Sequence, residues 1–324
     1  MSTDATTPLV SVILPSYNHA RYLPRRIGSI LNQTYANIEV LILDDCSPDN
    51  SREVIQAYAA QDARIIMLFN EQNSGSTFKQ WEKGLKQAKG KYIWIAESDD
   101  FAELTFLSEL VPLLEADETV VLAYSNSTIV DEHDHPNGTT ADWKNEHYQT
   151  QRWAENHVAD GKQEIEQYLQ FGCTINNASA VLFRRSSIDQ AGGVDSSFRY
   201  AGDWMTYLKV SLLGRLAYKG ACLSNYREHS TNASKKSFGD GSQRYERQRC
   251  FSYLHRTKAL SPAATKQLLK TASDEFIALV YDMLRLSWRP QLLASYTRRL
   301  AAANGAFYLR MQAQAIRTVI RRHS

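Results

Sequence analysis

Apolar residues along the first hundred positions alternate between two spacings, which predicts strands separated by helices. Four short runs rich in β-branched and aromatic residues are typical of buried strands: Val10–Leu14, Ile38–Leu43, Arg64–Phe69 and Tyr92–Ala96. Segments with helical spacing lie at 20–34, at 50–60 and from the turn at 70–75 to residue 88. Pro15 is predicted to end the first strand, and Asn50 with Glu53 resembles a capping box. This alternation indicates βαβ units and a mainly parallel sheet.

Beyond residue 100 the pattern of apolar residues is less regular, and after about residue 242 it becomes purely helical. Helices are predicted near 103–114, 186–191 and 204–213, and strands at 120–127 and 178–183. Asp131–Asp160 is polar, irregular and rich in His and Trp, which is typical of a functional loop or a disordered segment. After a Gly/Ser/Lys-rich linker at 235–242, apolar residues keep helical spacing up to Arg322. We therefore expect an α/β domain over 1–234, the linker, and an all-helical region over 243–324.

Composition places the chain among soluble globular proteins. Its 324 residues suffice for one large domain with an appendage or for two ordinary domains, and the 43% hydrophobic and 22% charged fractions are ordinary for that class. No apolar stretch approaches the roughly 18 residues of a membrane span. Met1–Pro8 has no basic residue, which argues against a secretory signal. The four cysteines are far apart, as expected for reduced thiols in the cytoplasm.

Charge is distributed unevenly along the chain. Arg244–Arg322 holds fifteen Lys and Arg against four Asp and Glu, whereas the remainder is acidic. This basic part contains an apolar stripe flanked by arginines, formed by Leu309, Ala313, Ile316 and Ile320 with Arg310, Arg317 and Arg321. The stripe suits an interfacial helix on a membrane, and equally a helix packed on its own domain or in a homo-oligomer. Nucleic-acid binding is not expected, because the basic residues are scattered and no recognition motif accompanies them.

Two of the predicted strands run directly into clustered acids. Asp44-Asp45 follows the second strand, and Glu97-Ser98-Asp99-Asp100 follows the fourth. Parallel strands bring their carboxyl ends to one edge of a sheet, where open α/β folds bind ligands. Carboxylates this close repel one another, and a hard divalent cation would offset the repulsion. The alternative is an acidic turn in which Asp99 or Asp100 caps the next helix.

Several segments at and around these strands, taken in order, resemble family 2 inverting glycosyltransferases of GT-A fold. They are Val10–Asn18, Leu43–Ser47, Asn73-Ser74-Gly75, Gly84 with Ala88–Ile93, and Glu97–Asp100. The resemblance extends to about Ser234 and leaves the C-terminal helices outside. It implies a Rossmann-like, mainly parallel sheet flanked by helices. Gly-rich dinucleotide and P-loop motifs are absent from the chain, so the sheet does not bind its ligand through either.

The resemblance implies a nucleotide-binding role for the first loop and the first acid pair. Pro15-Ser16-Tyr17-Asn18 would cradle the nucleotide, although Pro15 and Ser47 can equally serve only as turn residues. Asp44 would accept a hydrogen bond from the base N–H of a uracil or thymine, with Asp45 beside it. A carboxylate only accepts hydrogen bonds, so it suits an imide N–H and disfavours a base without one.

The second acid cluster resembles the Asp-x-Asp motif of the family. Asp99 would hold a divalent metal, Mn²⁺ or Mg²⁺, against the donor diphosphate, where the metal neutralises charge on the leaving group. Glu97 stands where the family has Asp, and it is expected with Ser98 on the donor side. Asn73 and Lys79 complete the donor-site candidates; the alternative for Lys79 is a solvated lysine on a helix.

A candidate base follows later in the chain. Tyr200–Trp204 resembles the Glu-Asp motif of the family, with Gly202 in place of Glu. The resemblance makes Asp203 the expected general base, which would take the proton of the acceptor hydroxyl as that oxygen attacks the anomeric carbon. The alternative is an N-cap role for Asp203 at the helix that begins near Trp204. Both roles are compatible with one side chain.

A second candidate for the metal comes from Asn225–Asn232, which resembles the Tyr-Arg-x-His element of the family. There His229 would approach the metal or diphosphate, and Arg227 would favour an anionic oxygen. His133-x-His135 with its neighbouring aspartates imitates a metal site, but no second cluster at ligand spacing supports it.

The resemblance, together with the two acid-tipped strands, implies an inverting, metal-dependent glycosyltransferase. It would transfer a hexosyl or deoxyhexosyl group from a UDP- or dTDP-sugar to a saccharide or lipid-linked acceptor in cell-surface polysaccharide or glycan assembly. The departures at Glu97 and Gly202 leave open a non-catalytic nucleotide-sugar-binding or assembly module whose helical tail binds partners. A nucleotidyltransferase is disfavoured because its Gly-rich first loop is missing. We expect a cytoplasmic protein, at the inner face of the membrane if the C-terminal stripe contacts lipid.

Overall fold

Residues 7–229, 241–286 and 290–323 are described by the computed structural model, in which the chain divides into two units. Unit 1 comprises residues 7–161, 175–197 and 209–229. Unit 2 comprises residues 162–174, 198–208 and the described residues from 241 onward. The linker predicted at 235–242 lies almost wholly outside the described residues, so the boundaries at 234 and 243 stay a prediction.

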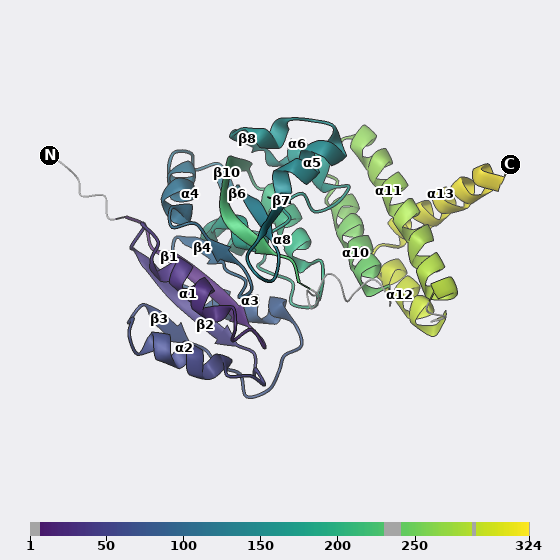
Figure 1. The fold of residues 1–324 in the computed structure, drawn as a ribbon. Helices are drawn as coiled ribbons and strands as arrows, with labels where there is room; N and C mark the ends of the chain where they lie inside the picture. The colour runs from purple at the N-terminus through teal and green to yellow at the C-terminus, as the bar shows by residue number, and fades with distance from the viewer. Residues whose placement is uncertain (1–6, 230–240, 287–289, 324) are drawn as a thin grey trace. The chain divides into compact units, whose positions relative to one another are not determined.

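Unit 1 is built on a ten-stranded mixed sheet (Figure 1). The main path runs β3-β2-β1-β4-β9-β6-β10-β5, with β7 paired to β6 and β8 paired to β10. The strands are β1 (Val10–Ser16), β2 (Ile38–Asp44), β3 (Ile65–Met67), β4 (Tyr92–Ile95), β5 (Phe101–Ala102), β6 (Val120–Val130), β7 (Pro136–Thr139), β8 (His157–Asp160), β9 (Val181–Arg184) and β10 (Arg215–Arg227). β1 pairs in parallel with β2 and β4, and β2 with β3, which confirms the predicted βαβ arrangement.

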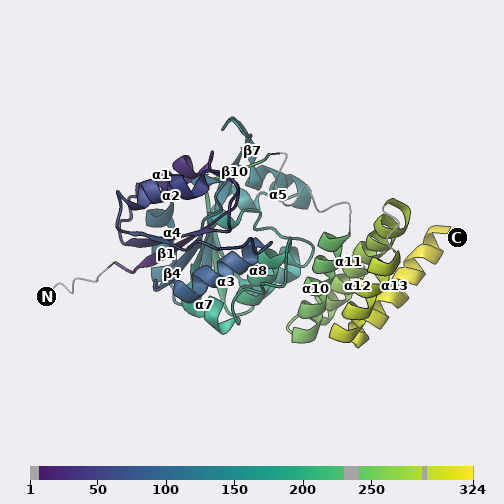
Figure 2. The same ribbon diagram turned by 90° about the horizontal axis from the view of Figure 1, so that it is seen from below.

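Helices cover both faces of this sheet. The first eight are α1 (Leu23–Leu31), α2 (Ser51–Ala59), α3 (Thr77–Gln87), α4 (Phe106–Glu115), α5 (Thr140–Tyr148), α6 (Gly161–Glu164), α7 (Arg185–Gln190) and α8 (Gly202–Ser211), with single turns η1 (Arg152–Ala154), η2 (Ile165–Leu169) and η3 (Ala178–Ala180). α1 and α2 lie on one side of the first strands, and α3 lies on the other (Figure 2). Gly84 lets α3 approach β1, because a Cβ at this position would lie 2.5 Å from Ile13 Cγ2.

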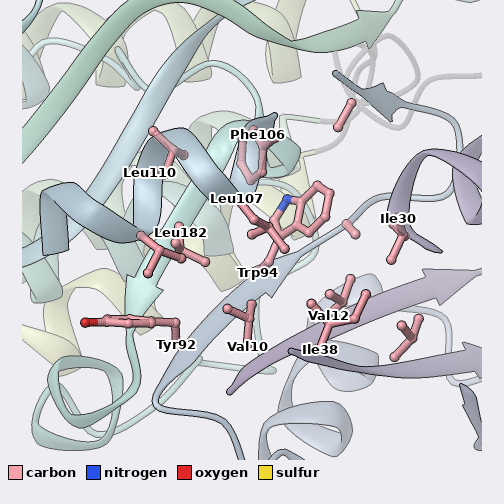
Figure 3. Packing of buried hydrophobic residues seen from close by; sticks show 14 of the residues in the cluster. Val10, Val12, Ile30, Ile38, Tyr92, Trp94, Phe106, Leu107, Leu110 and Leu182 are labelled. Carbon is pink, nitrogen blue, oxygen red and sulfur yellow. The ribbon is translucent and has the colours of Figure 1, made fainter. Parts of the chain in front are cut away.

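Trp94 of β4 occupies the centre of the core in unit 1. Its ring stacks on Phe106 of α4 with 4.5 Å between centroids, and Val12 and Ile30 belong to the same buried cluster (Figure 3). Full burial of such side chains contributes about 1.5–3 kcal/mol each. The packed core therefore fixes the end of β4, from which the second acid cluster continues.

Two details of the predicted elements are wrong. β1 does not stop at Pro15, because the pairing with β2 continues through Pro15 to Ser16. Asn50 is at the N-cap position of α2, but its side chain makes no capping hydrogen bond. The carboxylate of Asp49 accepts the N–H of Ser51 instead, at 3.1 Å. The predicted capping box is therefore absent.

The polar segment 131–160 is also not the irregular loop that its composition predicts. It forms β7, α5, η1 and β8, and Thr139 makes a capping box with Asp142 at the start of α5. Trp153 is fully buried within this segment and so anchors it in the core of unit 1. The long strand β10 was not predicted, because Gly220 and three register shifts against β6 interrupt its alternation.

Unit 2 contains the predicted all-helical C-terminal region, which is confirmed. Its helices are α10 (Ser242–Thr257), α11 (Pro262–Tyr281), η5 (Asp282–Leu286), α12 (Pro290–Ala303) and α13 (Gly305–His323). α13 buries Phe307, Met311 and Ala315, whereas Leu309 is 67% and Ile316 is 60% exposed. Within the described residues, no helix combines the length and apolar character needed to cross a membrane.

Candidate functional site

The carboxyl ends of β1, β2 and β4 meet at one edge of the sheet in unit 1. The β1–β2 register aligns Ser16 with Asp44, and the β1–β4 register aligns Ile13 with Ile95. Ala96 extends the second ladder by donating its N–H to the carbonyl of Ile13 at 2.8 Å. Both acid clusters therefore begin at the same edge, as the strand pattern predicts.

Asp44 is fully buried at this edge and uses only one carboxylate oxygen. Oδ2 accepts hydrogen bonds from the N–H of Ser47 at 3.1 Å and from Nε of Arg52 at 2.9 Å. Oδ1 is buried and has no hydrogen-bond partner among the described residues. A buried acceptor without a donor costs about 1–3 kcal/mol. Asp44 is thus suited to a ligand that brings an N–H.

Asp45 holds the loop that contains Asn73 and the start of α3, where Lys79 lies. Its carboxylate accepts four hydrogen bonds of 2.6 to 2.9 Å, from Asn70, from Gln80 and from both the N–H and the hydroxyl of Ser74. Asn73 and Lys79 are exposed, and Nζ of Lys79 donates to the carbonyl of Ser74 at 2.9 Å. Asp45 therefore shapes the loop, and the donor roles of Asn73 and Lys79 stay predictions.

Of the predicted loop Pro15-Ser16-Tyr17-Asn18, the first two residues end β1, and the chain turns at Tyr17 and Asn18. Asn18 has a positive φ of 57°, and its N–H donates to Oγ of Ser47 at 3.0 Å. The Tyr17 ring is 47% exposed at the tip of this turn, whereas Ser16 is buried and its hydroxyl has no partner among the described residues. The turn thus offers an aromatic face and a spare hydroxyl.

Asp99, His229 and a residue that the sequence did not single out, His19, form a cluster of candidate metal ligands. One ligand atom from each lies within 4.8 Å of the others, and Nε2 of His229 is 3.0 Å from Oδ2 of Asp99. Ser98 Oγ lies 2.8 Å from Nδ1 of His19 and so orients its ring. Such an orienting hydrogen bond is typical of ligating histidines. One carboxylate oxygen with two imidazole nitrogens suits a divalent cation, and Mn²⁺ better than Mg²⁺.

The electrostatics of the cluster separate its acids. Burial opposes ionisation of Asp99, but the hydrogen bond from His229 and the neighbouring histidine charges outweigh it, so the pKa of Asp99 is lowered. Burial and the charge of Asp99 raise the pKa of Glu97 to about 8 and that of Asp100 to about 7. Asp99 is therefore the acid most readily available as an anionic ligand.

Arg26 is the counter-charge beneath these acids. It is fully buried, its guanidinium lies 5.0 Å from the centroid of the Trp94 ring, and none of its side-chain nitrogens has a hydrogen-bond partner among the described residues. Burial lowers the pKa of Arg26 to about 10, while the charges of Asp100, Glu97 and Asp99 oppose that shift. Arg26 stays charged at neutral pH and stabilises ionised carboxylates above it.

Neither Asp99 nor Asp100 caps the helix that follows. The N-cap of α4 is Thr105, and Oδ1 of Asp100 accepts the N–H of Arg227 at 2.9 Å. The side chain of Glu97 points toward Trp81, whose indole N–H donates to Oε1 of Glu97 at 2.7 Å. The helix-cap alternative for the acid cluster is therefore wrong.

Arg227 is engaged in contacts within unit 1. Its Nε donates to the carbonyl of Asp99 at 2.7 Å, Nη1 donates to the carbonyl of Asp131 at 3.0 Å, and Nη2 pairs with Asp134. These contacts fix the chain between β10 and His229. The predicted approach of Arg227 to an anionic ligand oxygen stays a prediction.

The weaker metal candidate at His133 and His135 has different partners. His135 is exposed and its Nδ1 lies 3.0 Å from Oδ2 of Asp131, and Asp134 pairs with Arg25. In the part of the chain that the structure describes, the cluster of His19, Asp99 and His229 is the one group with ligand geometry.

Asp203 belongs to unit 2 and is the second residue of α8. It is therefore inside the first turn rather than at the N-cap position, and its Oδ1 accepts the N–H of Trp204 at 2.7 Å. Burial, together with the charge of Glu246, raises the pKa of Asp203 to about 6. A carboxylate with this pKa is ionised at neutral pH yet more basic than an ordinary aspartate, as a general base requires.

Comparison with known proteins identifies the family. Residues 11–192, more than half of the chain, match the sequence profile described as glycosyl transferase family 2. The chain belongs to this family.

Two curated glycosyltransferases resemble this family 2 chain over shorter stretches. GlyG of Streptococcus pneumoniae serotype 4 is 40% identical over 115 residues, which are 35% of this chain and 38% of GlyG.

The second relative is the UDP-Glc:alpha-D-GlcNAc-diphosphoundecaprenol beta-1,3-glucosyltransferase WfaP of Escherichia coli. It is 37% identical over 118 residues, which are 36% of this chain and 45% of WfaP. The family 2 chain therefore matches less than half of the length of either relative. Among solved structures, S. aureus TarS 1-349 in complex with UDP-GlcNAc has a TM-score of 0.70 at 15% identity and covers 95% of this chain and 88% of that chain. That likeness confirms the predicted GT-A fold.

Proposed function

We propose that this protein transfers a hexosyl or deoxyhexosyl group, with inversion, from a UDP- or dTDP-sugar to a saccharide or lipid-linked acceptor. The observation that carries the proposal is the convergence of Asp44 and of the cluster of Asp99, His229 and His19 at one edge of one sheet. A nucleoside diphosphate needs a base-reading acceptor and a positive centre for its phosphates. At this edge Asp44 is the acceptor for the base, and Asp99, His229 and His19 are candidate ligands for a cation that would supply the positive centre.

The base of the donor would bind at Asp44. Oδ1 of Asp44 is buried without a donor, and the imide N–H of uracil or thymine would satisfy it. The name of the relative WfaP includes a UDP-glucose donor, and TarS was solved with UDP-GlcNAc. Both point to a uracil nucleotide. Tyr17, half exposed on the adjoining turn, would stack on the base.

Asp99, His229 and His19 would hold the divalent cation, Mn²⁺ or Mg²⁺. When bound, the cation supplies positive charge that stabilises the departing nucleoside diphosphate. Ser98 keeps His19 oriented, and the positive charge of Arg26 favours the ionised form of Asp99. Glu97, held by Trp81, would face the donor sugar.

Asp203 would act as the general base. Its carboxylate takes the proton of an acceptor hydroxyl while that oxygen forms its bond to the anomeric carbon. The bond from the anomeric carbon to the diphosphate oxygen breaks on the opposite side, and its electron pair leaves with the nucleoside diphosphate. The anomeric configuration is therefore inverted. Such a base typically contributes 10²- to 10⁴-fold in rate.

The test is a panel of UDP-, dTDP-, GDP- and CDP-sugars, with and without Mn²⁺ or Mg²⁺. Binding should raise the melting temperature by mass action, and chromatography should show release of the nucleoside diphosphate when acceptor sugars are added. If no nucleotide stabilises the protein even with metal, the donor site is wrong. Metal-dependent binding without turnover of any donor would instead favour the non-catalytic module that the departures at Glu97 and Gly202 leave open.

We further propose that α13 binds an anionic lipid surface, which would place the enzyme at the inner face of the membrane. Leu309, Ala313 and Ile316 form an exposed apolar stripe, distinct from the face that α13 packs in unit 2. From Pro290 to Ser324 the chain has no Asp or Glu and six arginines: Arg298, Arg299, Arg310, Arg317, Arg321 and Arg322. Apolar residues beside unopposed positive charge complement anionic headgroups.

Vesicle sedimentation tests the lipid proposal. The protein should bind vesicles with phosphatidylglycerol more tightly than pure phosphatidylcholine, and Leu309→Gln with Ile316→Gln should weaken that binding at least tenfold. Met67→Gln is the control, because Met67 is 44% exposed on β3 of unit 1. Binding that the double variant leaves unchanged would overturn the proposal. The proposal would also be overturned if the wild type and Met67→Gln self-associate and the double variant does not, because the stripe would then contact a second copy of the chain.

A further inference from the structure

Glu246 of α10 is a buried carboxylate outside residues 11–192, which carry the family match. It is only 6% exposed, and its carboxylate accepts hydrogen bonds from three consecutive backbone N–H groups. Oε1 accepts from Arg199 at 2.8 Å, and Oε2 accepts from Tyr200 at 2.8 Å and from Ala201 at 2.9 Å. A single side chain from the tail thus fixes the segment directly before α8.

This segment has no side-chain cap of its own. The carbonyl of Ala201 accepts the N–H of Met205 at 3.0 Å, which makes Ala201 the N-cap residue of α8. An alanine side chain accepts no hydrogen bond. Asp203 accepts the N–H of Trp204 within the first turn. The carboxylate of Glu246 also lies at the positive end of the α8 dipole, where an anion is stabilised. It therefore replaces the missing cap from a distant part of the chain.

Glu246 also supplies a second acid beside Asp203. The sequence has Gly202 where the resemblance places Glu, so the local motif keeps only one carboxylate. The charge of Glu246 adds to burial in raising the pKa of Asp203 to about 6. The other ionisable groups of α10 near this turn are Cys250, Arg247 and Arg249: Sγ of Cys250 lies 4.0 Å from the carbonyl of Ala201, and the two arginines lie over Trp204 and Phe198.

We infer that Glu246 is the positioning residue of the proposed base Asp203: it binds the backbone of 199–201 and compensates for the acid lost at Gly202. The inference rests on the proposed function, in which Asp203 takes the acceptor proton. It also assigns a role to the helical tail, because α10 then holds the base in place. Glu246 itself contacts neither donor nor acceptor in this role.

Glu246→Gln tests the inference, since the amide keeps the size but removes the charge, and its NH₂ cannot accept an N–H. We expect kcat to fall about 10- to 100-fold, as a base misplaced by about 1 Å would produce, while KM for the donor changes less than about twofold. The acidic limb of the kcat–pH profile should shift to lower pH, because a like charge near Asp203 is gone. Backbone amides of 199–201 should exchange faster with deuterium.

Two further variants separate positioning from general destabilisation. Glu246→Asp keeps the charge on a shorter side chain, so the acidic limb should stay near that of the wild type while kcat falls. Glu166→Gln is the matched control, because Glu166 accepts the backbone N–H of Ser261 at 2.7 Å at another helix start in unit 2. It should leave both kcat and the acidic limb unchanged.

The outcomes distinguish this inference from the proposed function. A wild type that turns over a sugar nucleotide, with Glu246→Gln unchanged in kcat, in pH profile and in exchange of 199–201, would overturn the inference alone. Equal losses in Glu246→Gln and Glu166→Gln would reduce Glu246 to a structural residue. A wild type without turnover of any donor would overturn the proposed function and this inference with it.

Discussion

Nε2 of His229 lies 3.0 Å from Oδ2 of Asp99, although 130 positions separate the two residues in the chain. Two ligands of one cation at about 2.1 Å, at right angles to each other, are also about 3 Å apart. The hydrogen bond thus holds the pair at the spacing that a metal requires. Because ligand atoms must be deprotonated, metal binding is expected to compete with protons at this pair.

His19 should contribute to metal affinity. His19→Ala removes one of the two imidazole ligands that we propose, so we expect the Kd for Mn²⁺ to rise about 10- to 100-fold, measured by calorimetry without donor. Affinity for Mg²⁺ should change less, because Mg²⁺ favours oxygen ligands. His133→Ala is the control, since His133 is an exposed histidine of the same unit. An unchanged Kd for Mn²⁺ in His19→Ala would restrict the ligand set to Asp99 and His229.

Asp44 should discriminate between pyrimidine bases. The wild type should bind UDP more tightly than CDP, because N3 of cytosine is an acceptor and faces a carboxylate that can only accept. Asp44→Asn presents an amide NH₂ as a donor, so the ratio of the two Kd values should fall by about tenfold or more, about 1.4 kcal/mol per tenfold. Calorimetry with both nucleotides measures it.

The control for Asp44 is Asp62→Asn, a surface carboxylate of the same unit that pairs with Arg64. This variant should leave the preference for UDP intact. Equal affinity of the wild type for UDP and CDP would show that Asp44 does not contact the base.

The acids at the strand ends of the site could be predicted from the sequence, but the approach of His19 to Asp99 could not. Asp44 and Asp99 were predictable because each follows an apolar run, and the period of that run places its end at the sheet edge. His19 meets Asp99 only through the turn at Asn18, whose positive φ of 57° no hydrophobic pattern encodes. The one feature of the sequence that could have indicated His19 is its position directly after the predicted nucleotide loop.

The same limit applies to the fold. The period of β10 is broken by bulges, so local alternation could not reveal it, and its pairing with β6 decides its strand character. In the segment 131–160, polar composition concealed the fully buried Trp153. A lysine in a polar segment is expected to face solvent. Lys144 is instead only 1% exposed and lies over the rings of Tyr124, Trp153 and Tyr218 inside unit 1.

Transfer should depend on pH through Asp203. Its folded pKa of about 6 lies above the ordinary value, and the base is active only when ionised, so kcat should rise with pH and reach half of its maximum near pH 6. Asp203→Asn should abolish transfer and retain donor binding. Full activity of this variant would exclude Asp203 as the base.

The stability of Asp203→Asn serves as its control. A raised pKa means that the folded state disfavours the ionised carboxylate, so at pH 8 this group lowers the stability of the wild type. The melting temperature of Asp203→Asn at pH 8 should therefore be no lower than that of the wild type. A loss of transfer that came with a large drop in melting temperature would reflect unfolding instead.

Trp81 should control use of the donor through Glu97. Trp81→Phe removes the indole N–H that lies 2.7 Å from Oε1 of Glu97 and leaves that oxygen with the hydroxyl of Thr77 at 3.4 Å. An ordinary hydrogen bond contributes about 0.5–1.5 kcal/mol, and Glu97, with a pKa of about 8, is mostly uncharged at neutral pH, so kcat/KM for the preferred UDP-sugar should fall by up to about tenfold. The Kd for Mn²⁺ should change less than about twofold, because Trp81 contacts Glu97 and not Asp99.

Glu97→Asp extends this prediction to the choice of sugar. The side chain is one methylene shorter, so it would withdraw from Trp81, and the ratio of kcat/KM between two UDP-sugars should change while metal affinity is kept. Trp143→Phe is the matched control, since Trp143 is 47% exposed in the same unit. If Trp81→Phe and Trp143→Phe have the same kinetics, Glu97 does not act on the donor through Trp81. The replacement of Asp by Glu in the metal motif would then have no part in donor preference.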